Sequence, residues 1–509
     1  MNRSVMQKII ITSLLLLLSS LCFSNNLQLK NGSLHENVIS FEISWNNCWN
    51  HTNNDGNYDA AWIFTKGKLA NGEWKHLDLS NNSNSHQTSG SVNLELPTDC
   101  KGVFALSTNY GTFSSISSTI SLEIDDISDI QVIEVYAIEM VHISEGEFYV
   151  GDGASISSIG DSQGEPFLVD SENEITGTSL SIVNPNTYFT PESLPETIPT
   201  TFPKGFKGFY VMKYEVSQIQ YVDFLNTLSY NQQTNRTSIS PNAETGTYAM
   251  INHNQPDSLY RNGIVIVTPG EENGAPAVYG INANGNQSFN EDSDGLNRAA
   301  NFLSWADLAA YLDWAALRPI SEFEFEKICR GSGNEATTGE FSWGSSEVTN
   351  ANTPVNDGTV FETVSENASS GSGLANHGNT VASQGWGLRG VLRTGFAATE
   401  NSTRMEAGAG FYGVMELSGN VWEQTVMAAG EGVLFNGNFG DGQVDENGNA
   451  NVEGWCNNST ANGVILRGGG WGSTVSEVGS YRDLAVSDRF YSHLKPINRR
   501  NTVGGRGAR

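Results

Sequence analysis

The chain has 509 residues, with 56 Asp and Glu against 27 Lys and Arg, so its formal net charge is −29. Such an acidic surface repels nucleic acid and anionic membranes, which excludes both as expected partners. Hydrophobic residues make up 38% and aromatic residues 10% of the chain, which is enough to fill cores and argues against disorder. A chain of this length is expected to form two or three domains.

The first 24 residues have the order of a secretory signal peptide. Arg3 and Lys8 precede an apolar run over residues 9–18, and small and polar residues follow it. This order predicts export with cleavage after Ser24, and therefore a secreted, periplasmic or cell-surface protein. Lipidation of Cys22 is the alternative, although Leu21 before it is bulkier than lipoprotein signals usually allow. No stretch is long and apolar enough to predict a transmembrane helix.

Residues 25–136 alternate apolar and polar positions as β-strands do. In Ile39–Trp45 every second side chain is apolar, so one face of this strand is expected to be buried. Four similar segments follow between polar turns: Ala61–Phe64, Val92–Leu96, Val103–Leu106 and Ile120–Ile124. Several short strands with polar turns predict an all-β, sandwich-like domain.

Four cysteines remain after export, at positions 48, 100, 329 and 456. None forms a CxxC pair, so neither a zinc ribbon nor a thioredoxin-like site is expected. Cys48 and Cys100 fall in the same predicted domain, and an oxidising compartment permits a disulfide between them. We therefore predict a Cys48–Cys100 bridge.

Residues 137–509 combine a few helices with long polar segments. The spacing of apolar residues predicts two helices, Glu215–Leu228 and Trp305–Ala316, and a capping pattern after Pro319 predicts a third, Ser321–Cys329. The third begins with Ser321 and has Glu324 three residues later, which is the pattern of a capping box. Two inserts rich in Asn, Ser, Thr and Gly, at about 154–203 and 229–296, show little periodicity. They are expected to be surface loops that contribute little to the core.

The same region carries six short motifs: Met140–Phe148, Phe209–Ser217, Asn301–Asp307, Arg318–Glu326, Gly413–Glu423 and Arg467–Trp471. In this order they resemble the motifs of the formylglycine-generating enzymes, the sulfatase-modifying-factor family. One such motif alone would be weak, whereas six in the family's order are specific. The resemblance implies an α+β, variant C-type-lectin-like fold with little regular secondary structure, preceded here by the all-β sandwich-like domain.

In active members of that family, two cysteines bind copper and oxidise a substrate cysteine. Counted from the Arg467–Trp471 motif, the two positions fall at Ser473 and Val478, and no cysteine follows Cys456. Because Cu(I) selects thiolate ligands, copper is not expected here and no catalytic residue is assigned. A related branch, the iron-dependent sulfoxide synthases, uses a histidine cluster, but the eight histidines of this chain are scattered.

The resemblance also implies bound calcium. One site would use the side chains of Glu416 and Glu423 and the carbonyls of Gly419 and Val421. Calcium prefers several carboxylate and carbonyl oxygens, and a glycine turn lets a loop bend around the ion. The alternative is a tight turn in which Trp422 packs in the core and Glu423 pairs with an arginine.

A second calcium site of the family would use the side chain of Asn352 and the carbonyl of Thr353. The remaining ligands of that site cannot be placed on this sequence.

Arg489, Tyr491 and Arg500 lie where the family has its substrate groove, in a tail that we expect to be exposed, and they are candidate ligand-binding residues. The alternative places Arg489 and Arg506 in buried ion pairs and the aromatic residues in the core.

The sequence as a whole favours an exported, non-catalytic binding or surface-structural protein on a calcium-stabilised scaffold. Its expected partner is an unidentified protein or glycan at the cell surface, and self-assembly is left open. The alternative is a sulfatase-modifying or non-heme-iron oxidoreductase.

Overall fold

The computed structural model describes residues 15–18, 21–22, 27–52, 56–251, 259–272, 274–378, 389–399, 402–473 and 483–509. The chain divides into two compact units: residues 1–50 and 59–139 form unit 1, and residues 51–58 and 140–509 form unit 2. The predicted signal peptide lies largely outside the described residues, apart from the short strands β1 (Leu15–Leu18) and β2 (Leu21–Cys22). Within the described ranges, no helix has the length and apolar character needed to cross a membrane.

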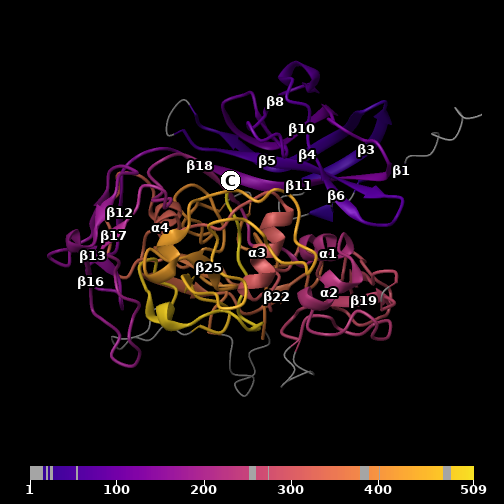
Figure 1. Ribbon diagram of the computed structural model, residues 1–509. Helices are drawn as coiled ribbons and strands as arrows, with labels where there is room; N and C mark the ends of the chain where they lie inside the picture. Colours follow the sequence, from indigo (N-terminus) through magenta and orange to yellow (C-terminus); the bar gives the residue numbers. More distant parts are fainter. Residues whose placement is uncertain are drawn as a thin grey trace, which may run out of the picture. The chain divides into compact units, whose positions relative to one another are not determined.

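Unit 1 is built on one large, mostly antiparallel sheet (Figure 1). Its further strands are β3 (Leu27–His35), β4 (Val38–Asn50), β5 (Tyr58–Leu69), β6 (Trp74–Leu77), β7 (Gln87–Thr88), β8 (Val92–Glu95), β9 (Val103–Ser107), β10 (Gly111–Glu123) and β11 (Ile130–Ile143). The longest ladder joins β10 to β4, from Gly111 opposite Asn50 to Glu123 opposite Val38. The segments predicted as strands lie within β4, β5, β8, β9 and β10. Closure of the sheet into a sandwich stays a prediction.

Strand β4 shows why these residues form a sheet. Ile39, Phe41, Ile43 and Trp45 alternate with polar residues, and each is at most 1% exposed. Side chains at every second position of a strand point to the same face, so these four enter the core together. Burying each contributes about 1.5–3 kcal/mol relative to exposure.

The predicted Cys48–Cys100 disulfide is wrong, because no disulfide joins any of the cysteines at 48, 100, 329 and 456. Cys48 packs among the apolar side chains of the unit 1 core. Cys100 sits in a turn with φ +55°, and its thiol lies 3.9 Å from the carbonyl oxygen of Thr98. A bridge needs two Cβ atoms facing each other about 4 Å apart, a condition that shared membership of a domain does not guarantee.

Unit 2 has short helices and many two-stranded sheets joined by loops (Figure 1). Its helices are α1 (Gln218–Asn226), α2 (Tyr230–Arg236), α3 (Trp305–Trp314) and α4 (Glu322–Arg330). Its strands are β12 (Phe148–Val150), β13 (Ile159–Asp161), β14 (Phe167–Val169), β15 (Ile175–Thr176), β16 (Leu180–Ile182), β17 (Thr197–Ile198), β18 (Phe209–Met212), β19 (Ile264–Thr268), β20 (Val278–Ile281), β21 (Glu347–Asn350), β22 (Pro354–Val355), β23 (Thr363–Val364), β24 (Ser372–Ala375), β25 (Glu423–Val426) and β26 (Val464–Arg467). Strand β18 pairs with residues 140–143 of β11, which belong to unit 2.

The three predicted helices are present as α1, α3 and α4, with ends that differ by at most three residues. The capping box of α4 is confirmed: Ser321 Oγ accepts from the Glu324 N–H at 3.1 Å, and the Glu324 carboxylate accepts from the Ser321 N–H at 2.8 Å. Helix α2 was not predicted, because its residues are mostly polar. The sequence feature that could have predicted this helix is its capping box, formed by Ser229 and Gln232.

The expectation that the two inserts are surface loops is corrected. The first insert contains β13 to β17, and its apolar residues enter one core with residues of α3, α4 and β26: Ile159, Val169, Ile175, Leu180, Ile198 and Phe202. The second contains α2 and the β19–β20 hairpin, whose Ile264 and Tyr279 are buried. Single apolar residues spread through polar sequence give no periodicity, so the pattern could not reveal them.

Candidate functional site

The Gly413–Glu423 motif forms a buried turn that carries two carboxylates. Glu416 is 6% exposed and Glu423 is fully buried. Glu416 Oε1 accepts from the Gly395 N–H at 2.9 Å, and Glu423 Oε1 accepts from Arg506 Nε at 2.6 Å. The second oxygen of each carboxylate is also buried and has no hydrogen-bond partner in the described chain. Gly419 bends this turn with φ +101°, where a Cβ atom would lie 2.9 Å from the carbonyl oxygen of Asn376.

A third carboxylate, which the sequence analysis did not assign, lies against the same turn. Glu215 is 1% exposed, and its two oxygens accept from Asn420 Nδ2 at 2.6 Å and from the Val421 N–H at 3.0 Å. Its only signal in the sequence was its place in the Phe209–Ser217 motif, shortly after β18. Glu215 therefore fixes the backbone of the predicted calcium turn.

The three carboxylates disturb one another electrostatically. Burial raises the pKa of Glu416 to about 7. Burial also raises the pKa of Glu423, against the opposing effect of Arg506. The pKa of Glu215 is raised well above its usual range, first by burial and then by the charges of Glu416 and Glu423. Three buried acids beside Arg506 and the nearby Arg393 make an environment that favours additional positive charge.

Both readings of this turn have support in its geometry. Trp422 packs with Leu466 and Val503, and Glu423 forms a buried ion pair with Arg506, as the tight-turn alternative requires. However, one oxygen each of Glu416 and Glu423 has no hydrogen-bond partner among the described residues. The carbonyls of Gly419 and Val421 also accept no hydrogen bond from described residues.

These four oxygens fit the ligand chemistry of calcium, which takes carboxylates and carbonyls. No cluster of three or more His, Cys, Asp or Glu side chains suited to a metal occurs in the described ranges. A calcium ion here would therefore depend on the two backbone carbonyls.

The second predicted calcium site has less available oxygen. Asn352 Oδ1 accepts from Thr353 Oγ1 at 2.9 Å, and the Thr353 carbonyl accepts from the Ser365 N–H at 2.9 Å. The backbone N–H groups of Asn352 and Thr353 point to Glu366 Oε2, at 3.4 and 3.2 Å. The oxygens of Asn352 and Thr353 are therefore already used in hydrogen bonds within the loop. Glu366 is a carboxylate beside this predicted site that the sequence did not assign to it.

Ser473, which stands at the first copper-ligand position, is a buried part of the fold. Its Oγ accepts from the Gly470 N–H at 3.0 Å, and its side chain hydrogen bonds to Asp483. Val478, at the second position, lies outside the described residues.

Burial raises the pKa of the Cys456 thiol to about 12 and that of Cys329 well above its usual range. Both thiols are protonated at neutral pH and are poor nucleophiles.

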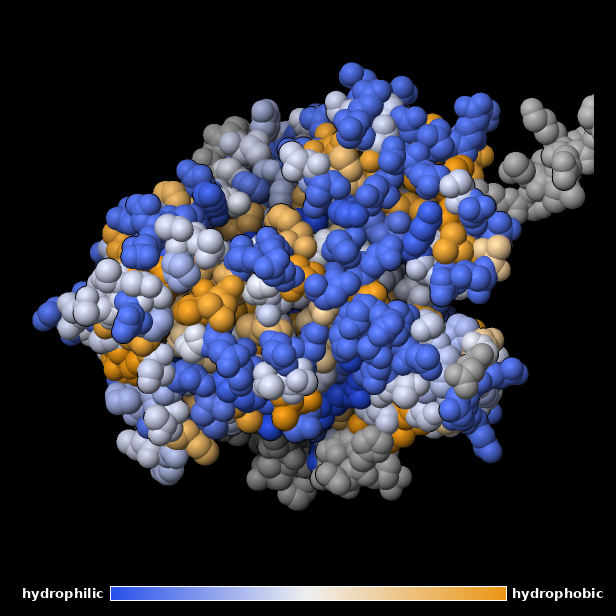
Figure 2. Space-filling view, viewed as in Figure 1, coloured by the Kyte–Doolittle hydropathy of each residue, from blue (hydrophilic) through white to orange (hydrophobic). Residues whose placement is uncertain are grey.

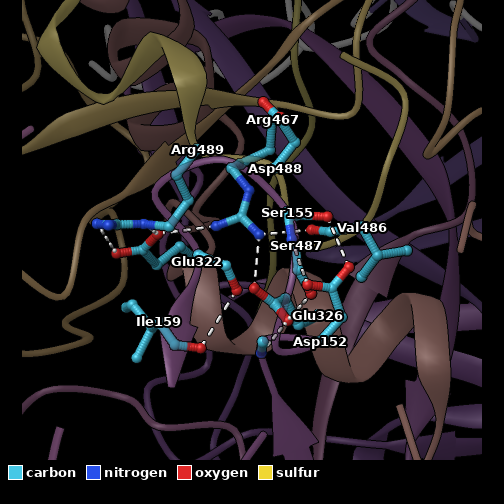
Figure 3. A network of polar contacts seen from close by, with 12 residues as sticks. Asp152, Ser155, Ile159, Glu322, Glu326, Arg467, Val486, Ser487, Asp488 and Arg489 are labelled. Carbon is cyan, nitrogen blue, oxygen red and sulfur yellow. Dashed lines mark hydrogen bonds and ion pairs between the residues drawn. The ribbon is translucent and has the colours of Figure 1, made fainter. Parts of the chain in front are cut away.

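The expectation that Arg489 is exposed for ligand binding is wrong. Arg489 is fully buried, and its guanidinium donates to both oxygens of Glu322, at 2.8 and 3.1 Å. Arg467 reaches the same helix, at 2.8 Å from Glu322 and 2.6 Å from Glu326. Figure 3 shows the two arginines converging on these carboxylates of α4. The alternative of buried ion pairs therefore describes Arg489 and Arg506.

The other two candidates of this segment differ from Arg489. Tyr491 is partly buried, with its ring edge-on to Trp422 at a centroid distance of 5.0 Å. Arg500 is exposed, while its carbonyl accepts from the Phe302 N–H at 3.0 Å. The structure thus leaves Arg500 and part of Tyr491 at the surface.

Comparison with known proteins identifies the class of domain. Residues 134–509 match the model of the sulfatase-modifying factor enzyme 1-like domain. The chain therefore belongs to this family, which confirms the resemblance carried by the six motifs. No curated protein matches the chain.

Proposed function

We propose that this protein is an exported, non-catalytic member of its family, which binds a protein or glycan at the cell surface or forms part of that surface. Its scaffold would be the variant C-type-lectin-like fold with an all-β sandwich-like domain before it. The observation that carries the proposal is the loss of the cysteine pair, because Ser473 and Val478 stand where active members have their copper ligands.

The residues that remain do not replace the missing pair. Oxidation by copper needs soft thiolate ligands, and the Ser473 hydroxyl is a hard ligand already used in hydrogen bonds. The thiols of Cys329, which is buried, and of Cys456, which is partly buried, hold their protons at neutral pH, because desolvation raises both pKa values. The signal peptide pattern supports export.

Calcium is the cofactor that we propose for the turn of Glu416, Gly419, Val421 and Glu423. When bound, the ion would supply positive charge to a group of carboxylates whose pKa values are raised by burial. The unpaired oxygens of Glu416 and Glu423 support this assignment. The role of Glu215 would be to hold the turn through its bond to the Val421 N–H.

Membership of the family favours an oxidoreductase as the second candidate, and one assay separates the two. Purified protein is incubated with copper, oxygen and a CxPxR-type sulfatase peptide, with an active family member as positive control. We expect the peptide thiol to persist in the mass spectrum. Loss of the thiol with gain of an aldehyde would overturn the proposal. A pull-down against cell-surface glycans and envelope proteins then seeks the partner.

A further inference from the structure

The loop of residues 282–295 follows strand β20 in the second insert and consists mostly of Asn, Asp, Glu, Gln and Ser. Hydrophilic side chains also predominate on the face of the molecule shown in Figure 2, where hydrophobic ones form small groups. At a surface such side chains are satisfied by water, whereas buried ones need partners within the protein. Of the polar residues in this loop, all within the described ranges, Asn282 and Asp294 are the two that are buried.

Asp294 is a buried carboxylate without a counter-charge. Its side chain has no exposed surface, and its Oδ2 accepts from the Glu291 N–H at 2.8 Å. Its Oδ1 has no hydrogen-bond partner, and the carboxylate forms no ion pair with any described residue. Burial accordingly raises the pKa of Asp294. Because an unpaired charge is costly to bury, this carboxylate favours a cation beside Oδ1.

Asn282 carries a second buried oxygen without a partner. The residue is 4% exposed, and its Oδ1 accepts no hydrogen bond from any described residue. Its backbone is fixed, because its N–H donates to the Gly263 carbonyl at 2.8 Å and its carbonyl accepts from the Tyr248 hydroxyl at 3.3 Å. Buried polar atoms normally contact a protein group, a water molecule or an ion, so an oxygen held in this way indicates a ligand from outside the chain.

The two ends of the loop lie side by side. The Ala283 N–H donates to the Asp294 carbonyl at 3.2 Å, and Asn284 Nδ2 donates to Ser293 Oγ at 3.0 Å. These contacts join residues 282–284 to residues 293–294, and we call the two segments together the neck of the loop. Asn282 and Asp294 both belong to this neck.

Tyr248 connects the two buried side chains to one place. Its hydroxyl is the group that donates to the Asn282 carbonyl. Burial and then the charge of Asp294 raise the pKa of Tyr248, so the carboxylate lies close to the same hydroxyl. A carboxylate oxygen, an amide oxygen and a hydroxyl therefore gather at the neck.

We propose that the neck of this loop binds a calcium ion, with Asp294 Oδ1 and Asn282 Oδ1 among its ligands. Calcium takes about six to eight oxygens from carboxylates, amides, carbonyls and water, and it accepts irregular geometry. The ion would compensate the Asp294 charge and occupy the Asn282 oxygen, which no described group of the protein does. The loop contains no Cys or His, the ligands that softer metals prefer, so a hard cation is indicated.

The sequence of the loop agrees with weak binding. Asparagines at 282, 284 and 286 alternate as the first ligands of calcium loops do, while the carboxylate at 294 falls one position beyond the last ligand of an EF-hand. A single buried carboxylate gives the site little charge, so we expect a dissociation constant of about 10⁻⁴–10⁻³ M, the range of extracellular modules. This site goes beyond the proposed function and does not depend on the turn of Glu416 and Glu423.

The first test counts calcium ions by equilibrium dialysis of the full exported chain, in about 0.15 M salt to screen the acidic surface. We expect Asp294→Asn to weaken the binding of one ion about tenfold or more, because asparagine keeps the shape and loses the charge. Asp292→Asn changes an exposed acid of the same loop and should bind calcium as the wild type does. Identical binding curves for the wild type and Asp294→Asn would overturn the inference.

Melting curves then distinguish a metal ligand from a residue that only shapes the loop. Without calcium, Asp294→Asn should melt no lower than the wild type, because it removes an unpaired buried charge. In about 10 mM calcium, the wild type should gain more than the variant, since the ion binds the native state. A variant that is destabilised equally with and without calcium would show a structural role alone.

Asn282→Leu is the second variant, and it decides the question if Asp294→Asn does not fold. Leucine has nearly the size of asparagine but no oxygen, so the gain in melting temperature with calcium should again fall below that of the wild type. A full calcium response in this variant would remove Asn282 from the site and overturn the inference.

The two calcium proposals fail separately. Because the loop binds weakly, EDTA without added calcium reports on the turn, whereas millimolar calcium reports on the loop. If Glu423→Gln alone loses calcium binding, the turn stands and the loop does not. Either result leaves the non-catalytic function to the peptide assay.

Discussion

At the scale of single residues, the core of unit 2 depends on charges that are fully buried. Arg467 contacts Glu322 and Glu326, and Arg330 contacts Glu326 and Glu340. Removing one partner of such a pair leaves an uncompensated charge and costs about 3–5 kcal/mol. The motifs of the sequence identified these residues but not their pairing, because partners such as Arg467 and Glu322 are 145 positions apart.

Asp488 is a buried acid whose cost to stability depends on pH. It is 5% exposed, and burial raises its pKa from 3.8 to about 8, although the Phe490 N–H donates to its Oδ1 at 2.9 Å. Between these two pKa values the folded chain holds a proton that the unfolded chain has released. Raising the pH therefore favours unfolding, by about 1.4 kcal/mol per pH unit at most.

We expect Asp488→Asn to remove this contribution, since asparagine does not ionise. Compared with the wild type, the variant should gain unfolding free energy steadily from pH 5 to about pH 8. Urea denaturation at several pH values measures the difference, with the exposed Asp292→Asn as control. A difference that is constant across this pH range would show that Asp488 is ionised in the folded chain.

At the scale of elements, apolar periodicity and capping residues each predicted helices that the structure contains. Helix α4 was predicted from Ser321 and Glu324, and both hydrogen bonds of the box are present. The short strands of the first insert were missed, because β15 and β17 have two residues each and gain their stability from packing in the core. Local sequence cannot encode a strand whose order comes from contacts with distant residues.

Ser321→Ala should therefore destabilise unit 2 in a defined way. The substitution leaves the Glu324 N–H without its acceptor in a buried environment, at a cost of about 1–2 kcal/mol. Thermal unfolding should show a lower melting temperature. Ser321→Thr keeps a hydroxyl and should recover most of the loss. An unchanged melting temperature for the alanine variant would mean that the cap adds nothing to α4.

At the scale of the whole molecule, the candidate calcium turn joins distant parts of the chain. The motif predicted Glu416 and Glu423. It did not predict Glu215, which binds the Val421 N–H from 206 positions earlier in the chain, or Arg506, which binds Glu423 from 83 positions later. Which charges face a turn is decided by the tertiary fold, so sequence alone could predict the turn and not its balance of charge. That balance bears on the stability of unit 2 as a whole.

Calcium binding at this turn should be visible as global stability. A ligand that binds only the native state stabilises it by about 2.7 kcal/mol at a hundredfold excess over its dissociation constant. EDTA should therefore lower the melting temperature of the wild type, and added calcium should restore it. Burial and then the charges of Glu416 and Glu423 raise the pKa of Glu215, and the ion would relieve the repulsion among the three carboxylates.

Glu423→Gln provides the decisive comparison. The variant loses the ion pair with Arg506, so its melting temperature should fall even without EDTA. The informative quantity is the change in melting temperature that EDTA causes. This change should be large in the wild type, small in Glu423→Gln, and as large as in the wild type in the exposed control Glu446→Gln. If EDTA leaves the wild-type curve in place and elemental analysis finds no calcium, Arg506 is the cation that this turn uses.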